Sequence, residues 1–135
     1  MNRRDEIEAI VRTVYEARVR GDIDTVMKHF APDAHFSLVG SASASPVPMT
    51  CTGHGAIRET MRRLCESFEF IRADMLSLVV EGDRATIHSE VHIRVPATSR
   101  EAVTEFADMV RFEGNKIASF KQFADTALAT QLIAG

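Results

Sequence analysis

The feature that most constrains the fold is a change in hydrophobic period at Glu69. Before it, apolar residues recur at helical spacing; after it, they alternate with polar residues, as in half-buried strands. Two dipeptides interrupt the alternation, Gly82-Asp83 and Gly114-Asn115, and each suits a two-residue β-hairpin turn. The pattern predicts helices first and then a sheet of three strands followed by a fourth, in an α+β fold.

The chain before Glu69 predicts three helices and one short strand. Gly21 suits the left-handed end of a first helix, Asp22 can cap a shorter second helix, and Pro32 is expected to end it. A strand is expected at residues 34–39, and the small, polar and proline-punctuated residues 40–48 predict a loop that could act as a mobile lid. The first and third helices take their apolar faces from Ile7, Ile10, Val11, Val14 and Ala17, and from Ile57, Met61, Leu64, Cys65 and Phe68. Asp125 is expected to cap a closing helix.

Length and charge limit the classes of function. A chain of 135 residues suits a single domain over residues 1–135 with one core. The net charge of −3 and the interleaved signs give no basic stripe, so we expect no nucleic-acid partner. No apolar run is long enough to span a membrane and the start lacks a signal region, so we expect a cytoplasmic protein. Cys51 and Cys65 do not have metal-ligand spacing, and we expect no metal.

Asp108 is a carboxylate at a position where the strand pattern favours an apolar residue. Alternation places it on the same strand face as Phe106, Val110 and Phe112. An ionised carboxylate on an apolar face is costly unless it is paired, hydrogen-bonded or shifted in pKa, and groups held in this way often take part in chemistry. Asp108 is therefore the main candidate for a catalytic residue, and a structural partner elsewhere in the fold is the alternative.

Counting outward from the two hairpin turns predicts the residues that surround Asp108. The second turn places Lys121 directly across from it, and matching the apolar faces of the preceding strands places Ser89 on the same side. The expected face forms an apolar wall with a few polar groups, as ligand pockets do. Its members are Asp74, Leu76, Leu78, Val80, Ile87, Ser89, Val91, Phe106, Val110, Ile117, Ser119, Lys121 and Phe123.

The same register places a second polar row on the opposite face of the sheet. His88, Glu90, His92 and Arg94 alternate along one strand and could in principle converge on a metal. They lie away from the Asp108 face, so a polar sheet surface or a hydrated dimer interface is the preferred interpretation.

The candidate residues also have structural interpretations. Lys121 could form a cross-strand ion pair with Asp108, which would lower the pKa of the acid, whereas burial alone would raise it. Asp74 could flank a ligand or pair with Arg72 at an exposed strand position. The Tyr15 hydroxyl could reach into a pocket or lie at the edge of the core.

Several motifs give the chain a resemblance to a known family. They are Gly21-Asp22-Ile23-Asp24, Phe30-Ala31-Pro32-Asp33-Ala34, Gly53-His54-Gly55-Ala56-Ile57-Arg58 and Arg111-Phe112-Glu113-Gly114-Asn115-Lys116-Ile117. With the order of helices and strands, they resemble the SnoaL-like branch of the nuclear transport factor 2-like superfamily. The resemblance implies a cone-shaped, curved mixed sheet wrapped around N-terminal helices, an internal apolar pocket, a homodimer and chemistry without a cofactor.

Comparison with individual branches narrows the implied chemistry. Asp108 resembles in position the protonated aspartate of ketosteroid isomerases, but the tyrosine and general-base positions of those enzymes fall on Val14 and Leu38. The catalytic histidine of the dehydratase branch would fall at residues 70–72, where this chain has none. The polyketide cyclase branch relies mainly on one acid/base aspartate, a requirement that Asp108 fits.

Two functional hypotheses follow. One is a domain that binds a small hydrophobic molecule without catalysis; the other is a cofactor-independent isomerase, cyclase, lyase or hydrolase with Asp108 as acid/base. In the second hypothesis, Lys121 or Tyr15 stabilises the developing negative charge. The ligand-binding residues expected in either case are Asp74, Ser89, Phe30, Phe106, Val110 and Phe123.

Overall fold

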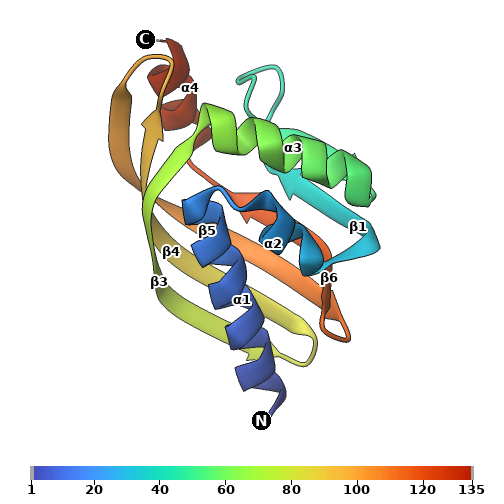
Figure 1. Ribbon diagram of the computed structural model, residues 1–135. Helices are drawn as coiled ribbons and strands as arrows, with labels where there is room; N and C mark the ends of the chain where they lie inside the picture. Colours follow the sequence, from blue (N-terminus) through green and yellow to red (C-terminus); the bar gives the residue numbers. More distant parts are fainter. Residues whose placement is uncertain (1, 135) are drawn as a thin grey trace.

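The computed structural model describes residues 2–134 and has one curved, unclosed six-stranded sheet, with the helices α1, α2 and α3 on its concave side (Figure 1). The strand order is β2-β1-β6-β5-β4-β3, and all neighbouring strands are antiparallel except β1 and β6. The α+β prediction is confirmed. The elements are α1 (Arg3–Arg20), α2 (Ile23–Lys28), β1 (Phe30–Leu38), β2 (Met49–Thr52), α3 (His54–Ser67), β3 (Glu69–Glu81), β4 (Arg84–Val95), β5 (Arg100–Glu113), β6 (Lys116–Phe123) and α4 (Thr126–Ala134).

Helix α1 has the ends and the buried face that its sequence predicts. The Asn2 side chain accepts a hydrogen bond from the Asp5 amide at 2.9 Å, and Gly21 ends the helix with a left-handed φ of 72°. The buried residues of α1 are Ile7, Val11, Val14 and Ala17, which form a single stripe against the sheet. Asp22 caps α2 through the Thr25 amide, and Asp125 caps α4 through the Leu128 amide, as predicted.

The prediction that Pro32 ends the second helix is wrong. Helix α2 ends at Lys28, and Pro32 lies exposed inside β1, which begins at Phe30 rather than at residue 34. The pairing of β1 with β6 shifts between Phe30 and His35, so the proline occupies an interruption in the ladder where no backbone donor is needed. Strand β2 was not predicted from the sequence.

Both predicted hairpins are present, with Glu81 opposite Arg84 and Glu113 opposite Lys116. In the first hairpin, Leu78 lies opposite Ile87 as expected, but a β-bulge beyond this pair places Met75 opposite Ser89. A bulge adds one residue to one strand, and because side chains alternate between faces it reverses the residues beyond it, here until a second shift between Phe70 and Arg72 restores the faces. Leu76 is consequently 54% exposed instead of buried.

The second hairpin contains a similar irregularity, next to Phe112. Consecutive residues Ile117 and Ala118 are both buried, so β6 uses one extra residue and the register moves by one. Asp108 then lies opposite Gln122, and Lys121 lies opposite Met109. The predicted pair of Asp108 and Lys121 is therefore wrong.

The pairing of β4 with β5 follows the prediction because no bulge interrupts it. Ile87 lies opposite Asp108, and Ser89 lies opposite Phe106. The alternate residues of β4 form the predicted polar row on the convex side of the sheet, where His88 and His92 contact Glu105 at 2.6 Å and Glu101 at 3.0 Å.

Substituting Ile87 and Leu76 by alanine tests the bulge in β3. Ile87→Ala should cost about 2–5 kcal/mol of unfolding free energy, because the side chain is fully buried and leaves a cavity. Leu76→Ala should change it by less than about 0.5 kcal/mol, measured by denaturant titration at low protein concentration. Equal losses that do not depend on concentration would contradict the bulged register.

Candidate functional site

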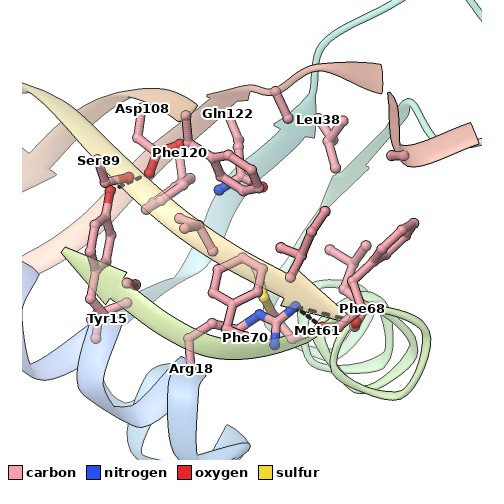
Figure 2. Close-up of a pocket in the computed structure, with 18 of the residues that line it drawn as sticks. Tyr15, Arg18, Leu38, Met61, Phe68, Phe70, Ser89, Asp108, Phe120 and Gln122 are labelled. Carbon is pink, nitrogen blue, oxygen red and sulfur yellow. Dashed lines mark hydrogen bonds between the residues drawn. The ribbon is translucent and has the colours of Figure 1, made fainter. Parts of the chain in front are cut away.

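An internal cavity lies between the concave side of the sheet and the helices, with a volume of about 80 Å³. Its walls are mostly apolar side chains from α1, α3 and strands β1, β3, β4, β5 and β6. The polar lining residues include Thr104, Gln122 and Asp125, and four others that lie in two places. Tyr15, Ser89 and Asp108 meet in one, and Arg18 reaches past Phe70 in the other (Figure 2).

Asp108 is the most deeply buried acid of the site, with 1% of its surface exposed. The Tyr15 hydroxyl donates a hydrogen bond to its Oδ2. Across residues 2–134, Oδ1 of Asp108 is the one buried side-chain nitrogen or oxygen atom without a hydrogen-bond partner. Such an orphaned polar atom is costly in an apolar environment, and each case in a native fold requires an explanation.

The environment of Asp108 shifts its protonation equilibrium. Burial raises the pKa of Asp108 to about 7, and the hydrogen bond from Tyr15 and the nearby polar side chain of Gln122 reduce the rise. Burial also raises the pKa of Tyr15, the charge and hydrogen bond of Asp108 raise it further, and Ser89 acts in the opposite sense. Tyr15 therefore keeps its proton and donates it in the hydrogen bond to Asp108, whose own charge changes near neutral pH.

The structure brings some of the predicted site residues together. Asp108, Tyr15, Ser89, Phe30 and Phe106 line the cavity. Val110, another predicted ligand-binding residue, is buried in the core near the cavity but does not line it.

Three predicted site residues lie outside the cavity. Lys121, Asp74 and Phe123 are exposed and do not line it, because the bulges next to Phe112 and in β3 place them on the convex side of the sheet. Asp74 forms an ion pair with Arg72, as its structural interpretation predicted. Lys121 can neither neutralise Asp108 nor stabilise charge in the cavity.

Gln122 and Arg18 line the cavity but were missed by the sequence reasoning. Gln122 lies directly across from Asp108 only because of the bulge next to Phe112, which the hairpin turn does not encode. Arg18 did have a signal: it follows Tyr15 by three residues on α1, and residues at this spacing share a helix face.

Arg18 is held firmly at the cavity wall. Its Nη2 donates to the carbonyl oxygens of Phe68 at 2.7 Å and Leu64 at 3.2 Å. The guanidinium carbon lies 3.8 Å from the centre of the Phe70 ring, a cation–π geometry. Burial lowers the pKa of Arg18, but an arginine guanidinium stays charged in proteins.

Residues 2–134 contain no group of three or more His, Cys, Asp or Glu side chains arranged to bind one metal ion. No helix in that part of the chain is long and apolar enough to cross a membrane. The arrangement that remains is a buried carboxyl with one free oxygen, a tyrosine that anchors the other oxygen, and a charged guanidinium on the same cavity.

Comparisons with known proteins agree with this architecture. The SnoaL-like domain model matches residues 11–120. A search of curated proteins finds no match. A solved NTF2-like protein of unknown function from Burkholderia pseudomallei is 24% identical, with a TM-score of 0.85 over 96% of this chain and 98% of that one.

Two further solved structures are named after activities. A protein from Bacillus subtilis, provisionally named an isomerase, is 12% identical with a TM-score of 0.89, over 100% of this chain and 97% of that one. An LEH-like epoxide hydrolase of M. tuberculosis is 12% identical with a TM-score of 0.77, over 98% and 96%. At these identities the structural matches establish the fold alone, and with the family match over most of the sequence they show that the chain belongs to the SnoaL-like domain family, within the NTF2-like fold.

Proposed function

We propose that this protein is a cofactor-independent enzyme that binds a small, mostly apolar molecule in its cavity and transfers a proton through Asp108. The observation that carries the proposal is the buried Oδ1 of Asp108, which has no partner in the described chain while Tyr15 holds the other oxygen. The large majority of buried polar atoms in native folds have a hydrogen-bond partner, so the free Oδ1 favours a role for Asp108 beyond the fold.

Asp108 has the properties of a general base. A proton-transfer group works best when its pKa lies near the working pH, and burial raises the pKa of Asp108 to about 7. Because Tyr15 fixes Oδ2, the lone pairs of Oδ1 are free to accept a proton from a bound molecule and to return it at another atom. Gln122 lies beside the acid and offers an amide that could donate to a developing oxyanion.

The size of the cavity limits the ligand. Its volume of about 80 Å³ is well below the roughly 300–1,000 Å³ of pockets for drug-sized molecules. Three aromatic rings, those of Phe30, Phe36 and Phe120, pack together along one wall and occupy much of the space. A compact ligand suits this cavity better than a polycyclic one.

Binding without catalysis is the competing function. In that case Asp108 would only hydrogen-bond to a ligand, and the small cavity would favour a molecule of a few heavy atoms. The names of two structural neighbours, a protein provisionally named an isomerase and an LEH-like epoxide hydrolase, support the enzyme over the binding function.

The expected homodimer is proposed to form through the convex side of the sheet. Val79, Val103 and Met109 on this side are 63%, 54% and 50% exposed, and paired histidines and glutamates lie between them. Exposed apolar residues that share one sheet face are typical of a protein–protein interface. In a two-fold dimer the same face of a second copy would cover them.

Substituting Met109 by arginine tests the dimer. The wild type should sediment as a dimer at micromolar concentration, and Met109→Arg should sediment as a monomer because it would bury two unpaired arginine charges, one from each protomer, in the two-fold interface. Glu8→Arg on the far side of the fold is the control and should leave the dimer intact. A wild-type monomer at every concentration would contradict the proposal.

Stability against pH tests the protonation state of Asp108. Its pKa is raised in the folded state from 3.8 to about 7, so its neutral form is favoured and the fold loses stability as pH rises from about 4 to about 7. The full effect is about 4 kcal/mol at roughly 1.4 kcal/mol per tenfold change in proton affinity. Asp108→Asn should remove this loss, so its advantage over wild type should grow with pH and level off above about 7.

Chemical denaturation of both proteins at several pH values measures this difference. Asp74→Asn is the matched control, since Asp74 is exposed on the same sheet, and its difference from wild type should not follow this curve. A constant difference between Asp108→Asn and wild type would mean that Asp108 is ionised throughout the range.

Hydrogen exchange into three- and four-carbon ketones in D₂O tests catalysis directly. The wild type should exchange the acidic C–H protons of at least one compound, with a rate that rises through pH about 7 as Asp108 ionises. Asp108→Asn should slow exchange by about 10²- to 10⁴-fold. Tyr15→Phe should move the midpoint to higher pH, because the Tyr15 hydrogen bond lowers the pKa of Asp108.

Proton NMR follows the loss of the substrate signals, and Asp74→Asn should match the wild type. Compounds that bind in the cavity but exchange at the same rate with wild type and Asp108→Asn would favour the binding function instead.

A further inference from the structure

Arg18 is a cation on the cavity wall that has no acidic partner. None of the ion pairs within residues 2–134 includes it. Besides Asp108, the acid that lines the cavity is Asp125, whose carboxylate caps α4. A charge in a mostly apolar environment is costly unless it is paired.

The surroundings of Arg18 orient the guanidinium without neutralising it. Both of its hydrogen bonds leave from Nη2, toward carbonyl oxygens at the end of α3. The flat face of the group lies over Phe70, and the Phe70 ring meets the edge of Phe106 at 5.5 Å between centroids. These contacts hold the side chain in place, so little rotamer freedom is lost when it binds something else.

The remaining donors of Arg18 are available. Nε and Nη1 make no hydrogen bond in the described chain, and both remain partly accessible, since Asp108 Oδ1 is the one fully buried side-chain nitrogen or oxygen atom of residues 2–134 that lacks a partner. An arginine presents its donors as a planar fork that matches the two oxygens of a carboxylate.

A structural role accounts for part of this arrangement. The carbonyls of Leu64 and Phe68 are at the C-terminal end of α3, where a cation is favourable, so Arg18 joins α1 to α3. That role uses one nitrogen of the three. It explains neither the stacking on a cavity ring nor the unused edge of the fork.

We propose that Arg18 binds a carboxylate of the ligand, so that the molecules handled by this cavity are small monocarboxylates with a short apolar body. The proposal rests on the proposed function only in requiring that the cavity binds a ligand. Arg18 and Asp108 line the same cavity, so a molecule bound there lies between the guanidinium and the acid. The cavity volume of about 80 Å³ is about half that of a cavity of about 150 Å³ that accommodates the six carbons of benzene, so it suits an acid of about three to four non-hydrogen atoms.

Titration with acetate and with the isosteric acetamide, followed by protein NMR, tests the carboxylate site. The wild type should bind acetate about 10- to 100-fold more tightly than acetamide, the range expected for a hydrogen bond to a charged group. Arg18→Gln should abolish this preference while its affinity for acetamide stays unchanged. Arg18→Lys should retain part of the preference, because the charge persists but the fork is lost.

Arg12→Gln is the matched control, since Arg12 lies exposed on the same helix in an ion pair with Glu8, and it should behave like the wild type. Equal binding of the two probes by the wild type would overturn the carboxylate site and leave the proposed function intact. Equal loss of both probes in a folded Arg18→Gln protein would assign Arg18 to the α3 cap and overturn the site. If Arg18→Gln does not fold, Arg18→Lys takes its place. Partial retention of the preference for the carboxylate by Arg18→Lys would support the site, and equal loss of both probes in the folded Arg18→Lys protein would overturn it. Binding of neither probe, with exchange of the neutral ketones still observed, would overturn the carboxylate site alone.

Discussion

The contact between Tyr15 and Asp108 is the interaction on which the rest of the site depends. It joins α1 to the middle of the sheet between residues 93 positions apart, and it crosses the cavity edge where α1 packs on the strands. The apolar stripe of α1 provides the packing energy, and the hydrogen bond fixes which residues of that helix face the cavity. The bond satisfies only Oδ2 of the buried acid. The contact therefore positions Asp108 and leaves Oδ1 without a hydrogen-bond partner.

The bulges explain why the sequence predicts the acid but not all of its neighbours. Between β4 and β5 the ladder is uninterrupted, so matching apolar faces correctly placed Ser89 and Ile87 near Asp108. On either side a single extra residue reverses the faces, which moves Lys121 and Asp74 to the convex side. The adjacent apolar residues Ile117 and Ala118 were a visible sign of irregularity, but two consecutive apolar residues also occur in regular strands.

Other features of the site depend on packing between distant elements and have no local signature. Gln122 becomes a neighbour of Asp108 only through the shifted register, and the contact of Arg18 with Phe70 requires that α1 crosses β3 at a particular rotation. The cavity volume depends on how far Phe30, Phe36 and Phe120 fill the cone. Sequence periodicity identifies which face of each element is buried, whereas the size of the space left between the faces is decided by the three-dimensional fit of side chains.

Arg18 and Asp108, two of the charged groups that line the cavity, have complementary roles. Arg18 keeps its charge, whereas the charge of Asp108 changes near neutrality, because burial raises its pKa while the hydrogen bond of Tyr15 and the nearby Gln122 side chain lower it. These three influences set the pKa of Asp108 without a contribution from a neighbouring cation. The charge of Arg18 does not contribute to the pKa of Asp108. An anion that neutralises Arg18 would therefore leave Asp108 with a pKa suited to proton transfer. A cavity with a permanent cation at one end and a titratable acid at the other can thus separate binding from chemistry along one short ligand.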